Sequence, residues 1–507
     1  MPLNPARLRT AFFKNATVNV VRLAAFSIVA LCLPPLLVHR LSKETYAAWV
    51  LIMQLSAYVL FFDLGLQSAV SHFVTYTEEK QDFGERDRIV SSATWLLAGL
   101  AGIGCLLVAG LTWQLPHFFH DIPRSLQPIV RQSLLLVGTS VALGLPVSAL
   151  AAIFLGRQQN QIPAGIAIAG RVLAALLIAA VVLAHHGLVW MAAVLALSNI
   201  ASYWMQYAAW ARWASDVRIA RGLVSGAAMR RLAQYCWGII VWTAGGLLIS
   251  GLDTTIVGVV DFSSLGYYGV AATLTLFLIQ LQGAVMSALL PVASTLRARD
   301  DDERLGELLV RCTRYGLLLL LLVGLPMILA AEPVLRLWVG ADYAAHTARI
   351  LQVLVAGNVV RLIGLPYATL VVGTNQQHLV TRSPIIEGIV NLLVSIWAGW
   401  MLGAIGVAIG TLVGAFFSIG IHLLYSMPRT TGIPVDRPRF LREGVLQPLL
   451  CALPVLLLAL LLEVAPAIDG APRALMIGTA AITTMLLLWS TGLAAAERQR
   501  ILVWVQS

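Results

Sequence analysis

Long apolar runs separated by short polar segments are the dominant pattern along the chain. A membrane-spanning helix needs roughly 20 apolar residues, and about fourteen such runs fit into this sequence. We therefore predict an all-α polytopic membrane protein with little room for a soluble domain. The predicted helices lie at roughly 13–37, 47–74, 89–113, 128–155, 163–184, 188–211, 237–259, 267–294, 311–331, 347–372, 379–402, 405–426, 446–463 and 472–492.

The composition supports the same class, because 59% of the residues are hydrophobic, only 11% are charged and the mean hydropathy is +0.84. The five cysteines are scattered without paired spacing, so we predict neither disulfides nor a metal site. The sequence contains no Walker loop, GxSxG or HExxH motif. We therefore expect a protein that is not an enzyme, needs no cofactor and does not use ATP directly.

The positive charge is distributed unevenly between the two sides of the predicted membrane. If the N-terminus lies inside, 24 of the 34 Lys and Arg residues fall in inner segments and five in outer loops. This asymmetry is the positive-inside signal, so we predict that both termini are cytoplasmic. The +10 net charge is thereby explained as topology, and we expect no nucleic-acid partner. The first apolar run ends without a signal-peptidase site and is expected to remain as the first helix.

An internal repeat divides the chain. The Ser-x3-Tyr pattern at 42–46 recurs at 263–267, an offset of 221 residues. The tripeptide Gly-Leu-Pro at 144–146 recurs at 364–366, an offset of 220. Each half then contains six helices, and an even number keeps the halves in the same orientation, related by a pseudo-twofold axis along the membrane normal.

The repeat predicts four segments. Six-helix lobes occupy 1–211 and 232–426, a cytoplasmic linker occupies 212–231, and 427–507 adds two transmembrane helices and a cytoplasmic tail. The linker mixes apolar residues with arginines. This pattern fits an amphipathic helix on the inner leaflet or a solvated basic loop, and the sequence leaves both open.

Four charged residues lie at a similar predicted depth inside the membrane: Arg22, Arg171, Arg361 and Glu387. At 1.5 Å per residue, all four lie roughly 12–17 Å deep, near the midplane. A charge at this depth costs about 2.5–3.5 kcal/mol on insertion scales, so it needs a partner or a water-filled cavity. The functional interpretation is a cationic cavity between the lobes, where arginine pairs with phosphate oxygens. The alternative is structural ion pairing inside a helix bundle.

Other polar positions give candidate coupling sites. Glu387, with Asn391 one turn further, suits proton coupling or an ion pair with an arginine. Asp63 and Asp253 each suit a cation or proton site, or a carboxylate at a helix end. The GxxxGxxxG spacing at 406–414 predicts close helix packing.

The chain resembles the polysaccharide and O-antigen flippases (Wzx-type) of the MATE-like multidrug/oligosaccharidyl-lipid/polysaccharide exporter superfamily. The resemblance covers the whole layout, but its motifs are loose. The residues that carry it are Pro34-Pro35, Leu41-Ser42-x3-Tyr46-x2-Trp49, Phe62-Asp63-Leu64-Gly65-Leu66, Leu252-Asp253 and Leu265-Gly266-Tyr267-Tyr268.

This resemblance implies a MATE-like fold that works by alternating access. The implied cargo is a polyprenyl-diphosphate-linked oligosaccharide, moved from the inner to the outer leaflet of a bacterial inner membrane, with an ion gradient as energy source. Its setting would be O-antigen, lipopolysaccharide or exopolysaccharide biosynthesis, with a glycan polymerase and a chain-length regulator as partners beside the membrane lipids. Arg22, Arg171 and Arg361 become candidates for contact with the diphosphate or with acidic sugars.

Three alternatives stay open at this point. A lipid II flippase of the same superfamily is poorly separated from the preferred interpretation. A MATE-type drug or cation antiporter usually carries cationic cargo, which an arginine-rich cavity disfavours. A membrane glycan polymerase or ligase needs an acceptor site on its outer face, and the predicted outer loops are short and poor in acidic or histidine residues.

Overall fold

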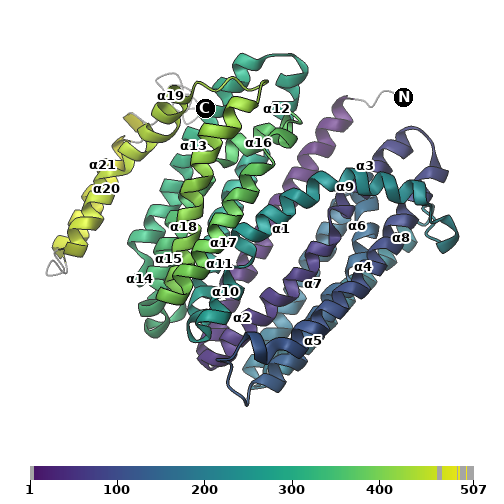
Figure 1. Ribbon diagram of the computed structural model, residues 1–507, viewed down its shortest axis with the longest axis horizontal. Helices are drawn as coiled ribbons and strands as arrows, with labels where there is room; N and C mark the ends of the chain where they lie inside the picture. Colours follow the sequence, from purple (N-terminus) through teal and green to yellow (C-terminus); the bar gives the residue numbers. More distant parts are fainter. Residues whose placement is uncertain (1–4, 465–470, 488, 491–497, 499–507) are drawn as a thin grey trace.

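A computed structural model describes the chain except residues 1–4, 465–470, 488, 491–497 and 499–507. The described residues form helices and connecting turns, with no strand among them (Figure 1). The α-helices are α1 (Pro5–Arg40), α2 (Lys43–Ala57), α3 (Leu66–Glu79), α4 (Phe83–Phe118), α5 (Gln127–Leu143), α6 (Leu145–Gly156), α7 (Gln161–Leu183), α8 (Leu188–Trp213), α9 (Gly226–Gly246), α10 (Asp253–Val260), α11 (Leu265–Ser287), α12 (Leu289–Ala298), α13 (Asp302–Leu329), α14 (Ala331–Val339), α15 (Ala341–Leu362), α16 (Leu365–Gly373), α17 (Arg382–Leu402), α18 (Ala404–Ile421), α19 (Arg437–Arg439), α20 (Gln447–Val464) and α21 (Ala471–Leu487).

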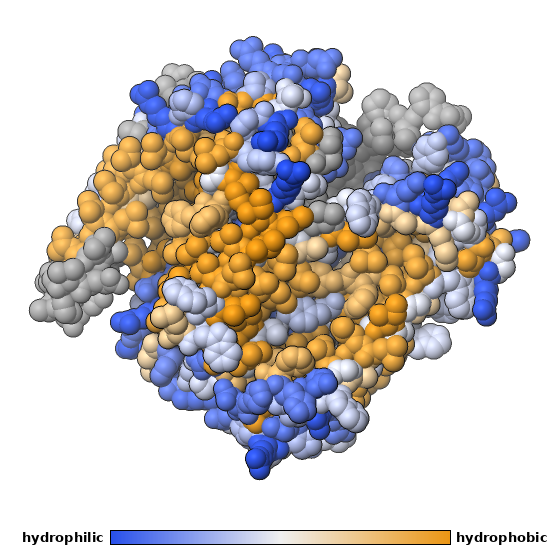
Figure 2. Space-filling view, viewed as in Figure 1, coloured by the Kyte–Doolittle hydropathy of each residue, from blue (hydrophilic) through white to orange (hydrophobic). Residues whose placement is uncertain are grey.

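The prediction of an all-α polytopic membrane protein is confirmed. Within the described residues, 13 helical segments are long and apolar enough to cross a membrane. The last predicted helix, 472–492, falls on the 17-residue α21, and part of it lies outside the described residues. Figure 2 shows an apolar belt across the molecule, bordered by hydrophilic residues at both ends. This belt is the surface that a lipid bilayer covers.

The helices gather into two groups. The first helix group comprises α1–α8, the second helix group comprises α10–α18, and α9 crosses from one to the other (Figure 1). The groups approach each other at one end and diverge at the end where the N-terminus lies. Helices α20 and α21 lie beside the second helix group, with α20 packed against α13.

Helix breaks recur in both groups. Helix α5 gives way to α6 at Gly144, and α15 gives way to α16 at Gly364, each followed by a proline near the start of the next helix. Proline is favoured at that position because the first helical N–H groups lack intrahelical partners. The turns after α6 and α16 also match, since Gln158 and Asn375 both have positive φ, 59° and 58°. The internal repeat seen in the sequence is therefore present in the backbone.

Some predicted helices are interrupted. The segment predicted at 47–74 is α2, a 3₁₀ turn, and then α3, with Leu64 and Gly65 in the left-handed region at φ 51° and 79°. The segment predicted at 237–259 contains a π-helical turn, Leu247–Gly251, between α9 and α10. Apolar periodicity gave no sign of these interruptions, because the flanking residues on both sides remain apolar.

The linker between the groups does not form an amphipathic helix. Apart from a short 3₁₀ turn at Arg221–Leu223, residues 214–225 are irregular and lie against α4. The Ser91 hydroxyl donates to the Arg218 carbonyl at 3.2 Å, and Ser92 accepts the Ser225 N–H at 3.0 Å. The arginines of 212–231 are exposed, as expected for a solvated basic loop, whereas Val217 is completely buried.

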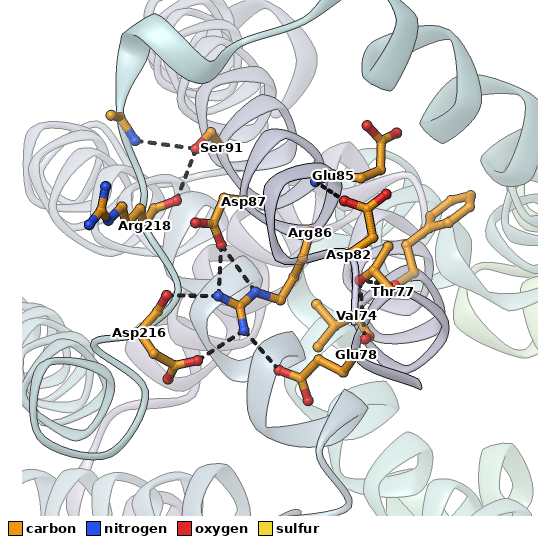
Figure 3. A network of polar contacts seen from close by, with 12 residues as sticks. Val74, Thr77, Glu78, Asp82, Glu85, Arg86, Asp87, Ser91, Asp216 and Arg218 are labelled. Atoms are coloured by element: carbon orange, nitrogen blue, oxygen red, sulfur yellow. Dashed lines mark hydrogen bonds and ion pairs between the residues drawn. The ribbon is translucent and has the colours of Figure 1, made fainter. Parts of the chain in front are cut away.

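An ion network fixes the linker to the first helix group (Figure 3). Arg86 on α4 is only 2% exposed and contacts Glu78, Asp87 and Asp216, with the Asp216 carboxylate at 2.9 Å. Arg157, at the turn after α6, pairs with the same Asp216 at 2.5 Å and with Glu78 at 2.8 Å. The side chains come from three helix ends and the linker, so the linker is a bound part of the first helix group.

Candidate functional site

Two of the predicted arginines lie together in the first helix group. The Arg171 guanidinium on α7 is 5.7 Å from the ring centroid of Phe26 on α1. Phe26 is one helical turn after Arg22, so Arg22 and Arg171 lie within about one turn of each other along α1. Both arginines are exposed. Among the described residues, neither has a carboxylate in ion-pair distance.

Helix α1 forms the boundary between the two groups. It packs against α7 in the first group and against α11 and α14 in the second. Two guanidinium groups without carboxylate partners at this boundary can bind an anion. Arginine stays charged at all relevant pH values and presents paired N–H donors that match phosphate oxygens.

The third predicted arginine, Arg361, lies elsewhere. Its guanidinium on α15 donates to the Asn358 side chain and interacts electrostatically with Glu387, Asp253 and Tyr268. These residues come from α17, α10 and α11, so Arg361 is enclosed within the second helix group. The structure therefore separates Arg361 from Arg22 and Arg171.

The predicted coupling residues Asp253 and Glu387 are both 5% exposed and lie near Arg361. Asp253 accepts a hydrogen bond from the Thr411 hydroxyl at 2.9 Å and also interacts with the Tyr268 side chain. Glu387 accepts one from the Ser418 hydroxyl through Oε2, and its Oε1 is buried without a partner among the described residues. The two carboxylates and one guanidinium form a polar core inside the second helix group.

Asn391 lies in the same group and connects three helical segments. Its side-chain N–H donates to the Ile249 carbonyl, which belongs to the π-helical turn. Its oxygen accepts the Ser395 hydroxyl at 2.8 Å, and that hydroxyl is also 3.3 Å from the Val407 carbonyl on α18. Asn391 therefore supports the irregular backbone next to Asp253.

Asp63 has the position of a helix-end carboxylate. It closes the 3₁₀ turn before Leu64, and its Oδ2 accepts the backbone N–H of Gln67 in α3 at 3.4 Å. Its Oδ1 accepts the Ser148 hydroxyl from α6 at 2.9 Å. The structure thus places Asp63 away from Asp253 and Glu387, in the first helix group.

The glycine spacing at 406–414 serves packing, as predicted. A Cβ atom at Gly406 would lie 1.9 Å from the Ala398 carbonyl oxygen, and one at Gly410 would lie 2.1 Å from the Ser395 hydroxyl. Only glycine allows α17 and α18 to approach this closely.

Contacts that the sequence did not reveal close the narrow end between the groups. Lys43 on α2 pairs with Asp342 on α15 at 2.8 Å, and Tyr46 packs edge-on against Tyr343. The Tyr58 hydroxyl donates to the Gly251 carbonyl at 3.0 Å. These partners lie about 200–300 positions apart in sequence, and no local pattern marks such pairs.

The chain shares a fold with membrane transporters and matches one protein family. The family model described as "Polysaccharide biosynthesis protein" matches residues 40–348. No curated protein sequence matches the chain at a significant level.

Solved structures match over most of their length. "Lipid II flippase MurJ, inward closed conformation" superposes with a TM-score of 0.72 and 14% identity, covering 94% of this chain and 98% of that one. An inward-facing multidrug resistance MATE family transporter of the MOP superfamily gives 0.68 and 14%, covering 82% and 98%. The Vibrio cholerae MATE transporter VcmN in the bent form gives 0.56 and 12%, covering 85% and 99%. At such low identities these matches establish the fold alone.

Proposed function

The chain belongs to the polysaccharide biosynthesis protein family, and we propose that it moves a polyprenyl-diphosphate-linked oligosaccharide from the inner to the outer leaflet. The family and the fold support a membrane transporter of the flippase type. The oligosaccharide cargo, its use in O-antigen, lipopolysaccharide or exopolysaccharide biosynthesis, and the alternating-access cycle are our proposal. The basic inner segments support a bacterial inner-membrane location with both termini in the cytoplasm.

The pair Arg22 and Arg171 is the observation that supports this cargo. Both lie at the boundary between the helix groups, exposed and without carboxylate partners among the described residues. A diphosphate carries several oxygen acceptors, and two adjacent guanidinium groups match them with charge-assisted hydrogen bonds. The oligosaccharide would then lie between the groups while the lipid tail stays in the bilayer.

The second helix group supports a separate role in ion coupling. Asp253, Glu387 and Asn391 are buried in a polar core that Arg361 partly neutralises. This position supports Arg361 as part of the coupling site more than as a direct contact of the cargo. Asp63 accepts hydrogen bonds from Gln67 and Ser148 at a helix end, which supports a structural role. Coupling to an ion gradient remains part of the proposal.

A second candidate cargo is lipid II. The observation that favours it is the structural likeness to the lipid II flippase, which extends over 94% of this chain. Both cargoes present an anionic head group to the same arginines, so the arginine test below applies to either. Measuring lipid II export in cells that lack their own lipid II flippase distinguishes the two cargoes.

Removal of the two charges tests the proposal. We expect Arg22→Gln and Arg171→Gln to abolish surface polysaccharide while membrane levels of the protein stay normal. Arg171→Lys should retain only part of the export, because lysine keeps the positive charge but cannot bind two oxygens side by side. The matched control is Arg88→Gln, an exposed arginine at the inner end of α4. Normal export by both glutamine variants would refute the assignment.

A further inference from the structure

Polar side chains on one face of α18 and its continuation contact the buried carboxylates of the second helix group. Thr411, Ser418 and His422 are spaced by seven and four residues, so they share one helical face. The Thr411 hydroxyl donates a hydrogen bond to Asp253, and the Ser418 hydroxyl donates one to Glu387. At 1.5 Å per residue, the row rises about 10 Å from Thr411 to Ser418 and about 6 Å from there to His422.

The two carboxylates in this row differ in their hydrogen bonds. Asp253 accepts a hydrogen bond from the Thr411 hydroxyl and also interacts with the Tyr268 hydroxyl, and both contacts favour the ionised form. Glu387 accepts only from Ser418, and its Oε1 is buried without a partner in the described part of the chain. A buried oxygen without a partner disfavours a fixed negative charge.

The charge balance shows that one of the two carboxylates needs a second cation. Arg361 on α15 is the cation that interacts with both Asp253 and Glu387. One guanidinium neutralises one carboxylate, so one negative charge is left over inside the helix group. Uncompensated charge in a low-dielectric interior is removed most easily by uptake of a cation.

A proton fits the Glu387 position better than a metal ion does. Sodium- or calcium-type cations require several oxygen ligands. Around Glu387 the described neighbours offer one serine hydroxyl, and Arg361 would repel a second cation. A proton needs only the free oxygen.

His422 lies at the inner end of the row. Its ring packs edge-on against Tyr367 on α16 at 5.4 Å, and its Nδ1 is buried without a partner among the described residues. Imidazole exchanges protons near neutral pH. It lies beyond Glu387 toward the basic 427–444 segment that we predict to be cytoplasmic.

Resting on the proposed transport function, we propose that the coupling ion is a proton, that Glu387 binds it, and that His422 passes it between Glu387 and the inner face. Asp253 remains ionised as the partner of Arg361. The groups that face Glu387 are thus Arg361 from α15 and Ser418 from α18, and Arg361 also interacts with Asp253 from α10. Tyr268 from α11 faces Asp253, and Tyr367 from α16 faces His422. In transport, binding and release of the proton at Glu387 change the net charge of the polar core.

A disulfide across the narrow end reports the conformation. A Cβ at Gly269 on α11 lies 3.4 Å from the Cβ of Val50 on α2, close to the separation found in disulfides. The pair Val50→Cys/Gly269→Cys therefore joins the two groups only while this end is closed. The matched control pair is Val108→Cys/Gly138→Cys, with 3.3 Å between the corresponding atoms and both residues in the first helix group.

The experiment measures the ratio of the two disulfides in the full-length protein in membrane vesicles, by mass spectrometry of the linked peptides. The control pair corrects for the pH dependence of thiol chemistry. We expect the ratio to change by at least about threefold between about pH 5.5 and 8, independent of sodium. In Glu387→Gln we expect the ratio to be independent of pH. In His422→Gln we expect the ratio to reach its new value more slowly after a change of pH.

The possible results are distinguishable. A ratio that ignores pH, or that follows sodium at fixed pH, overturns the proton assignment. A pH response that persists in Glu387→Gln overturns the role of Glu387. Should Glu387→Gln fail to form the control disulfide, Glu387→Asp replaces it, and an unshifted pH midpoint there overturns the same role. Full export by the protein cross-linked at Val50 and Gly269 refutes the transport cycle itself instead.

Discussion

The two helix groups share the positions of their breaks but arrange their charges in opposite ways. In the first group, Arg22 and Arg171 are exposed at the boundary and lack carboxylate partners among the described residues. In the second, Arg361 is enclosed with Asp253 and Glu387. The positions 220 residues before the latter three are apolar: Leu33, Val141 and Ala167.

This difference separates two tasks within one repeated backbone. The repeat specifies where helices bend, because glycine and proline determine those bends whatever the surrounding chemistry. Charges at the boundary can reach a large anionic cargo, whereas charges enclosed in a helix group can exchange only small ions. The proposed division of labour between cargo binding and coupling rests on this contrast.

The largest expected effect comes from replacing an arginine by methionine in each of the two helix groups. Arg361→Met leaves Asp253 and Glu387 without their cation, and loss of a buried partner costs about 3–5 kcal/mol of folding free energy. Arg171→Met removes an exposed charge and is expected to change stability by less than about 0.5 kcal/mol. Thermal unfolding of the purified protein measures both. Equal stability of the two variants would contradict the contrast between the groups.

The ends at which the two groups diverge allow a second comparison (Figure 1). Arg86 is 2% exposed and holds three carboxylates, so Arg86→Met is expected to cost about 2–3 kcal/mol. At the matching end of the second group, Arg297 and Asp302 form a pair with both side chains about 40% exposed. Arg297→Met should cost less than about 1 kcal/mol. Denaturant titration with the two variants side by side tests the ranking, and a reversed order would refute it.

Helix packing gives a smaller expected effect. In the second group, a Cβ at Gly406 meets the backbone oxygen of Ala398 at 1.9 Å, and Gly406→Ala is expected to cost about 1–2 kcal/mol. In the first group, Gly170 faces the Ser202 hydroxyl, which can rotate away, so Gly170→Ala should cost less. Gly420→Ala, with open space around it on α18, is the control. If all three variants melt together, the α17–α18 contact does not require glycine.

The smallest expected effect is the response of the linker to acid. The hydrogen bond from Arg157 holds the pKa of Asp216 below its ordinary value of 3.8. A carboxylate with a lowered pKa contributes stability above its unfolded pKa and loses it as the pH falls through the folded value. Protease cleavage of the linker should therefore stay constant from neutral pH down to about pH 5 and increase only in stronger acid. The Asp216→Asn variant should be cleaved faster than the unmodified protein at every pH. Equal cleavage rates for the two proteins would show that Asp216 does not fix the linker.

The helical architecture was predictable because the signals are local. Apolar runs mark the helices, and Gly144 and Gly364 with their nearby prolines mark matching breaks. The spacing at 406–414 correctly indicated close packing, because small residues at that interval have one common use in lipid. The break at Leu64 agrees with the helix-end alternative for Asp63, whereas the π-helical turn was not predictable, since its backbone is held by a contact with another helix, between Asn391 and Ile249.

Depth along the chain identified the charges inside the membrane-spanning segments but could not group them. Arg22, Arg171 and Arg361 have similar calculated depth, yet rotation of each helix about its axis decides which neighbours it meets. The sequence also gave no reason to single out His422, the residue proposed to pass the proton, although its spacing of four from Ser418 is visible afterwards. Arg86 was counted only as one of many inner-side charges, because its carboxylate Asp216 lies 130 residues later.

The docked linker has a consequence for how the protein is made. All the contacts described for it, from Arg86, Ser91, Ser92 and Arg157, are with residues that the ribosome has already synthesised when the linker emerges. The first helix group can therefore be closed and fastened before any helix of the second group enters the bilayer. The linker can form these contacts in the order in which the chain is synthesised. It therefore docks on the first helix group before the similar second group is present to compete for it.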